Sequence, residues 1–125
     1  MRLEEVITIH ELMCNAARDL IEKKGMDYNR AQQKEDTLFN MKVATLLGIT
    51  DTNTQSVLVR LSDKFMRFIS LAKDPSVKPA NAEEKIEDTV LDIINYTIYT
   101  YIMHKEYNQD PEWLRLMESN EEMMK

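Results

Sequence analysis

Apolar residues recur along most of this chain at the three- and four-residue spacing of amphipathic helices. The pattern predicts four main helices, over residues 3–24, 31–47, 54–73 and 81–107, the last counted from its N-cap. Asp110 followed by Pro111 has the form of an N-cap and first helical residue, which predicts a short fifth helix. The connections are short, so neighbouring helices are expected to be antiparallel.

Glycines and capping residues mark where these helices should begin and end. Gly25 and Gly48 are expected to end the first two helices. One of residues 51–53 should cap the third helix. Asn81, with Glu84 three residues later, has the spacing of a capping box. The prediction is an all-α, four-main-helix bundle in one domain, residues 1–118, with a short C-terminal helix and a frayed tail at 119–125.

Composition narrows the class of protein. The 125 residues include 16 basic and 22 acidic side chains, a net charge of −6 without a basic block, which argues against binding duplex nucleic acid. Two glycines and three prolines favour long helices over a turn-rich β fold. Cys14 is the single cysteine, which excludes an internal disulfide and favours a reducing cytoplasm. No run approaches the roughly 20 apolar residues of a membrane span.

Candidate chemistry gathers on the fourth predicted helix. Glu84, Asp88 and Asp92 follow at four-residue intervals, so they share one face, and Asn95 and Tyr99 continue the line. Like charges at this spacing cost a helix roughly 0.2–0.5 kcal/mol per pair. Apolar residues flank Asp92, where a carboxylate needs a compensating cation or hydrogen bonds. A bound divalent metal is the sharpest hypothesis for this face.

Ion pairing between helices is the alternative for the same side chains. Asp63 and Arg67 are four residues apart on the third predicted helix, so they can pair without any ligand. Asp88 and Asp92 can likewise be neutralised across the interface between the third and fourth helices. A structure that brings Asp88 and Asp92 opposite Asp63 favours the metal; pairing with cations favours the structural role.

Three segments resemble the nucleotide modification associated domain 1 family, found in bacteria and their phages. They are E-K-K-G-M-D-Y-N at 22–29, L-S-D-K-F-M-R-F at 61–68 and E-K-I-E-D-T-V-L-D-I-I-N-Y at 84–96. That family is thought to be related to the MazG-like all-α nucleotide pyrophosphohydrolases. The resemblance covers about residues 10–105 and implies a MazG-like fold, a nucleotide ligand and Mg²⁺, or alternatively Mn²⁺.

Residue by residue, the resemblance implies a carboxylate site with two departures from the related enzymes. Thr89 stands where the first carboxylate of an E-x-x-D motif is expected, with Asp88 as its substitute. Met66 and Arg67 stand where the second carboxylate of an E-x-x-E motif is expected. The resemblance implies Asp63, Asp88 and Asp92 as metal ligands, and the line of carboxylates adds Glu84. Asp63 and Asp92 are also expected in catalytic roles.

Basic and polar side chains near these carboxylates are the candidates to contact the nucleotide. Lys64 and Arg67 would neutralise phosphates, the first as a point charge and the second as a bidentate donor. A solvated surface explains Lys64 equally well, and an ordinary helix-ending loop explains the D-Y segment. The candidate nucleotide contacts are Lys24, Asp27, Tyr28, Lys64, Arg67 and Asn95.

Two functions follow as hypotheses. The first is a Mg²⁺-dependent pyrophosphohydrolase that cleaves nucleoside triphosphates between the α and β phosphates. The second is a non-catalytic nucleotide-binding or protein-interaction module of phage or bacterial origin. Either would act in the cytoplasm of a bacterium or of an infected host cell. The wide apolar arc of the fourth helix predicts a homo-oligomer, a dimer or tetramer.

Overall fold

The computed structural model describes residues 1–32, 36–73, 76 and 85–124, without the side chains of 25–32 and 122–124. This part of the chain contains helices and no strand, so the all-α class is confirmed. The helices are α1 (Leu3–Gln32), α2 (Phe39–Leu46), α3 (Asn53–Lys73), α4 (Ile86–Asn108) and α5 (Pro111–Met124). None of them, as far as they are described, is long and apolar enough to cross a membrane.

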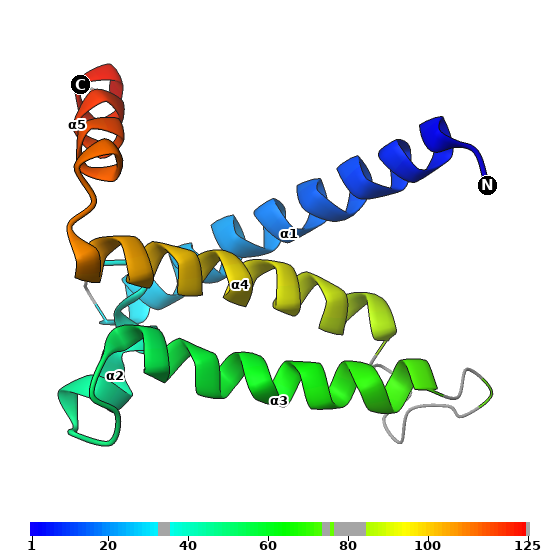
Figure 1. Cartoon of the computed structure of the whole chain (residues 1–125), viewed down its shortest axis with the longest axis horizontal. Helices are drawn as coiled ribbons and strands as arrows, with labels where there is room; N and C mark the ends of the chain where they lie inside the picture. The colour runs from blue at the N-terminus through cyan, green and yellow to red at the C-terminus, as the bar shows by residue number, and fades with distance from the viewer. Residues whose placement is uncertain (33–35, 74–75, 77–84, 125) are drawn as a thin grey trace.

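Helix α4 is the centre of the fold (Figure 1). It packs antiparallel to α3 on one side and crosses α1 on another, while α2 packs against the start of α3. The buried cluster consists of Met41 from α2, Val57 from α3 and Met103 from α4. The side chains of Leu38, Tyr96 and Tyr99 pack around this cluster. The wide apolar arc of α4 is therefore mostly explained by its neighbours within one chain.

The boundary between the first two helices differs from the prediction. Helix α1 continues through Gly25 to Gln32, and α2 begins only at Phe39. A glycine inside a helix costs about 1 kcal/mol relative to alanine, which weakens a helix without ending it. The Asp36 carboxylate instead accepts a hydrogen bond from the Leu38 N–H at 2.9 Å, which opens the turn before α2. Gly48 does follow the end of α2, with a left-handed φ of 76°.

The observed starts of α3 and α4 can be compared with the N-caps that the sequence predicts. Thr52 caps α3, because its hydroxyl accepts a hydrogen bond from the Gln55 N–H at 3.2 Å. The predicted cap at Asn81 and Glu84 lies outside the described residues. Within them, α4 begins after Lys85, whose N–H donates to the Asp88 carboxylate at 3.3 Å. Asp88 therefore has a capping role at the start of α4.

Lys42 ties α2 to the end of α4. Its ammonium lies 2.7 Å from the Asp36 carboxylate and 3.7 Å from that of Glu106. Burial alone lowers the pKa of Lys42, but these two carboxylates outweigh it and hold the pKa above its ordinary value. The contact fixes the short helix against the long one beside the buried cluster.

The two ends of the chain stand away from this body (Figure 1). The first part of α1 projects beyond the helices it packs against, and α5 leaves the end of α4 at a steep angle. Gln109, in a left-handed conformation with φ 49°, makes the turn into α5. The rings of Tyr101 and Trp113 pack in a T-shaped arrangement, with 5.8 Å between their centroids. Helix α5 extends to Met124, into the segment 119–125 that the sequence predicts to be a frayed tail.

Asp110 is expected to decide whether α5 is helical. Its Oδ1 accepts from the N–H groups of Glu112 and Trp113, both at 3.1 Å, as the sequence predicted for an N-cap. The backbone bond from Trp113 and the contact with Lys105 hold the pKa of this carboxyl below its usual 3.8. Replacing Asp110 with alanine should reduce the helical circular dichroism signal, whereas Asp110→Asn should retain it.

The pH dependence of this cap has a defined sign. Because the pKa of Asp110 is lower in the folded chain, its stabilisation of α5 is present above about pH 3.8 and is lost as the pH falls through the folded pKa. The wild-type and Asp110→Ala spectra should therefore converge at low pH. Equal helicity of the two proteins at pH 7 would show that the cap is dispensable.

Candidate functional site

Asp92 lies where three helices meet. From the middle of α4, its Oδ2 contacts the Lys64 ammonium of α3 at 3.0 Å, and its Oδ1 lies 3.9 Å from the Lys24 ammonium of α1. The Asp92 side chain retains 19% of its exposure. The Lys64 ammonium also lies 5.9 Å from the centre of the Tyr96 ring, one turn along α4. The carboxylate that the sequence placed among apolar neighbours is thus compensated by two cations.

A small cavity opens beside Asp92, between α1, the segment before α2, and α4. Its volume is about 30 Å³, enough for a water molecule. Asn95 lines this cavity and is only 5% exposed. The Asn95 amide donates to the Ala17 carbonyl oxygen at 3.1 Å, while its Oδ1 has no hydrogen-bond partner among the described residues. A buried acceptor without a hydrogen-bond donor costs about 1–3 kcal/mol of stability. The Asn95 Oδ1 therefore needs a donor.

An open hollow lies on the other side of Lys64, along α3. It measures about 310 Å³ and is lined by Arg60, Asp63, Lys64, Arg67 and Tyr96. Three cations and one carboxylate therefore meet beside one aromatic ring, although the chain carries a net charge of −6. The Arg60 guanidinium also donates to the Asn40 carbonyl at 3.2 Å, which anchors it toward α2. The hollow is a local basic surface on an acidic protein.

The three predicted metal ligands that fall among the described residues, Asp63, Asp88 and Asp92, do not form one cluster. Asp92 contacts Lys64 rather than Asp63, because adjacent helical residues point about 100° apart and Lys64 is the one turned to α4. Asp63 is exposed at the edge of the hollow, and Asp88 is exposed at the start of α4. Glu84 lies outside the described residues. Where the chain is described, no three histidine, cysteine, aspartate or glutamate side chains are grouped to hold a metal.

The predicted nucleotide contacts divide between the two spaces. Lys24 and Asn95 line the small cavity, while Lys64 and Arg67 line the hollow. Asp27 and Tyr28 fall in the part of α1 whose side chains are not described.

Two residues of the hollow were not among the predicted contacts. Arg60 is four residues before Lys64 and seven before Arg67, a spacing that places all three on one face of a helix. This spacing alone could have identified Arg60 as a member of the same basic face. Tyr96 packs against the buried cluster, and it also lines the hollow.

Comparisons with protein-family models, with curated proteins and with solved structures found no match to this chain.

Proposed function

We propose that this protein is a nucleotide-binding domain, and that the hollow on α3 receives the phosphate groups. The observation that carries the proposal is the convergence of Arg60, Lys64 and Arg67 beside Tyr96. Guanidinium groups bind phosphate in a bidentate manner and an ammonium binds it as a point charge. A volume of about 310 Å³ is at the lower end of the range for small-molecule sites.

Asp92 would act on this site through Lys64. Its carboxylate holds the Lys64 ammonium at 3.0 Å, which limits the positions that this flexible side chain adopts. An ammonium has three donors, so one is used by Asp92 and the others remain for phosphate oxygens. Tyr96 offers a ring against which a base can stack, an interaction worth about 1–3 kcal/mol in nucleic-acid complexes.

A metal ion fits this arrangement only together with the nucleotide. Mg²⁺ is commonly bound by one or two carboxylates plus substrate phosphates. Asp92 is the described carboxylate closest to such a role, but both of its oxygens face lysine ammonium groups. Cleavage between the α and β phosphates is what the family resemblance implies; binding is what we propose.

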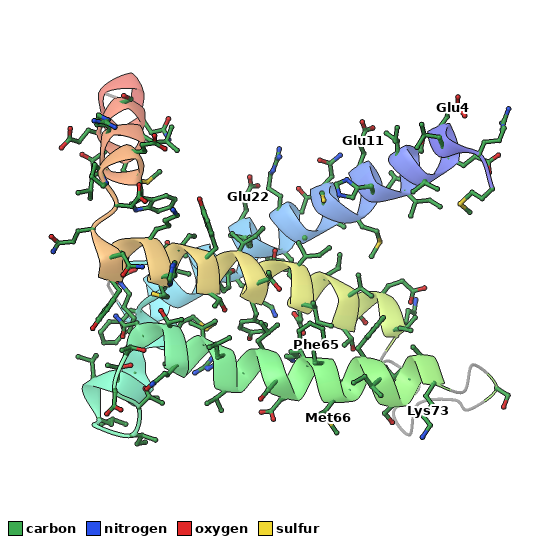
Figure 2. All side chains as sticks on the ribbon, in the orientation of Figure 1. Glu4, Glu11, Glu22, Phe65, Met66 and Lys73 are labelled. Carbon is green, nitrogen blue, oxygen red and sulfur yellow. The ribbon has the colours of Figure 1, made fainter. Side chains whose placement is uncertain are left out.

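Calorimetric titration with nucleoside and deoxynucleoside triphosphates, each with and without Mg²⁺, tests the proposal. We expect Lys64→Ala to weaken binding by about tenfold or more, because a hydrogen bond to a charged group contributes about 1.5–3 kcal/mol. Lys73→Ala is the matched control, since Lys73 lies on the same helix but on the side turned away from α4 (Figure 2). Asp92→Asn should weaken binding less than Lys64→Ala, because it leaves the cations in place.

The outcomes separate the two candidate functions. Absence of binding at millimolar nucleotide, or equal losses in Lys64→Ala and Lys73→Ala, would reject the phosphate site. Release of pyrophosphate with Mg²⁺ or Mn²⁺ would add hydrolysis to binding. A melting temperature raised by nucleotide plus Mg²⁺, but not by Mg²⁺ alone, is expected if the metal binds with the nucleotide.

A further inference from the structure

The Asn95 side chain presents a fixed hydrogen-bond acceptor to the small cavity beside Asp92. Its Nδ2 group donates to the Ala17 carbonyl oxygen of α1 at 3.1 Å, whereas the reversed amide would bring two acceptor oxygens together. The amide is therefore held in one orientation. Asn95 is 5% exposed, and no described residue donates to its Oδ1. The cavity thus needs a hydrogen-bond donor that the described part of the chain does not supply.

The size and charge of this cavity restrict the donor to one small, neutral group. Its volume of about 30 Å³ is that of one water molecule. Asp92, the one carboxylate among the described residues that line it, already contacts the ammonium groups of Lys64 at 3.0 Å and Lys24 at 3.9 Å. A cationic donor would lie beside Lys24 without a free carboxylate to compensate it. An uncharged amino group meets both restrictions, as does water.

The cavity adjoins the hollow that is proposed to receive phosphate. Tyr96 lines both spaces. Asp92 lines the cavity and contacts Lys64, which lines the hollow, so this ion pair lies between the two. Asp92 and Asn95 are neighbours on one face of α4, about 4.5 Å apart along the helix axis. A nucleotide with its phosphates at Lys64 and its base against Tyr96 therefore has the edge of the base directed to Asn95.

We propose that Asn95 selects nucleotides whose base carries an exocyclic amino group, which occupies the cavity and donates to Oδ1. This inference rests on the proposed function, because the phosphate contacts bring the base to the cavity. Adenine, cytosine and guanine carry such a group, whereas uracil, thymine and hypoxanthine do not. A keto oxygen in the same place would face Oδ1 and leave two acceptors without a donor.

The ring N–H of uracil does not replace the amino group. It lies between two keto oxygens, and a space of about 30 Å³ admits one group of the size of water. Bringing this N–H to Oδ1 would also bring a keto oxygen toward the acceptors of Asn95 and Asp92. The site therefore distinguishes bases by the group that projects from the ring.

Calorimetric titration with two matched pairs of nucleotides tests the inference. Cytidine and uridine triphosphates differ in an amino and a keto group, as do adenosine and inosine triphosphates, while the phosphates are the same. We expect the amino member to bind about tenfold more tightly in at least one pair, because the keto member leaves buried acceptors unpaired. Equal affinity within both pairs would overturn the inference and leave the cavity to water. A preference for the keto member in either pair would overturn it too.

Two variants locate the selection. Asn95→Leu should abolish the preference, because leucine has a similar volume and no acceptor. Asn108→Leu is the matched control, since it makes the same change at an exposed position of α4, and it should keep the preference. A preference that survives in Asn95→Leu, or that both variants lose, would contradict the assignment to Asn95. The wild-type comparison stands by itself if Asn95→Leu does not fold.

The failure of this inference can be told apart from the failure of the proposed function. Inorganic triphosphate, titrated alongside, tests the phosphate site without a base. If it binds and the four nucleotides bind alike, the phosphate site stands and base selection is rejected. If neither it nor any nucleotide binds at millimolar concentration, both are rejected. Lys64→Ala should weaken both members of a pair by the same factor, because the two members share their phosphate contacts.

Discussion

Met103→Ala is expected to lower the free energy of unfolding by about 2–5 kcal/mol, the usual range for truncating a buried methionine or leucine. Met103 is 1% exposed and packs with Met41 and Val57 in the buried cluster. Alanine would leave a cavity at the point where α2, α3 and α4 meet. Among the described residues the other buried apolar side chains are those of Ala17 and Leu61, so little core remains to compensate the loss.

Urea unfolding followed by circular dichroism measures this effect, and Met66→Ala provides the control. Met66 is 67% exposed, and Figure 2 shows it on the side of α3 turned away from α4. The same chemical truncation there should change stability by less than about 0.5 kcal/mol. Similar losses in the two variants would mean that α4 does not pack as described.

Asn95→Asp is expected to destabilise the protein by about 3–5 kcal/mol at neutral pH, as other uncompensated buried charges do. The carboxylate loses the hydrogen bond that the Asn95 amide donates to the Ala17 carbonyl, which joins α4 to α1. It also adds a negative charge one turn from Asp92. Lys24 lines the same cavity, but its half-exposed ammonium already lies 3.9 Å from Asp92.

The pH dependence of Asn95→Asp, and a neutral control at the same position, separate the effect of the buried charge from the effect of changing the side chain. Burial raises the pKa of the new carboxyl in the folded state, so the loss should be absent below the unfolded value of about 3.9 and grow as the pH rises above it. Asn95→Leu removes the unpaired Oδ1 together with the donor, and should change stability by less than about 1.5 kcal/mol. Equal losses at pH 7 for the two variants would contradict the electrostatic account.

The helix count and several boundaries follow from local chemistry. Thr52 and Asp110 act as N-caps because a side-chain oxygen reaches backbone N–H groups two or three residues away, a relation contained in the sequence. Gly48 ends its helix through its own left-handed backbone. Gly25 does not end α1, because a glycine weakens a helix without specifying where it stops.

In the candidate site, too, some features follow from the sequence and others only from how the helices pack. The sequence by itself identified Asp92 as a carboxylate in need of compensation, because its immediate neighbours on α4 are apolar. It also offered Lys64 and Arg67 as basic side chains for a phosphate. Which group compensates Asp92 depends on the rotation of α3 about its own axis and on where α1 crosses α4. A rotation of one residue would present Asp63 instead of Lys64.

The sequence alone therefore determined the all-α class, most of the helical segments and the polar residues of α4, since each depends on contacts within a few residues. Only the tertiary structure decided that Asp92 pairs with Lys64 and Lys24, that Asn95 is buried against Ala17, and that the start of α1 is left uncovered. Those features join residues far apart along the chain. Their positions are set by how whole helices pack, which no local pattern of residues specifies.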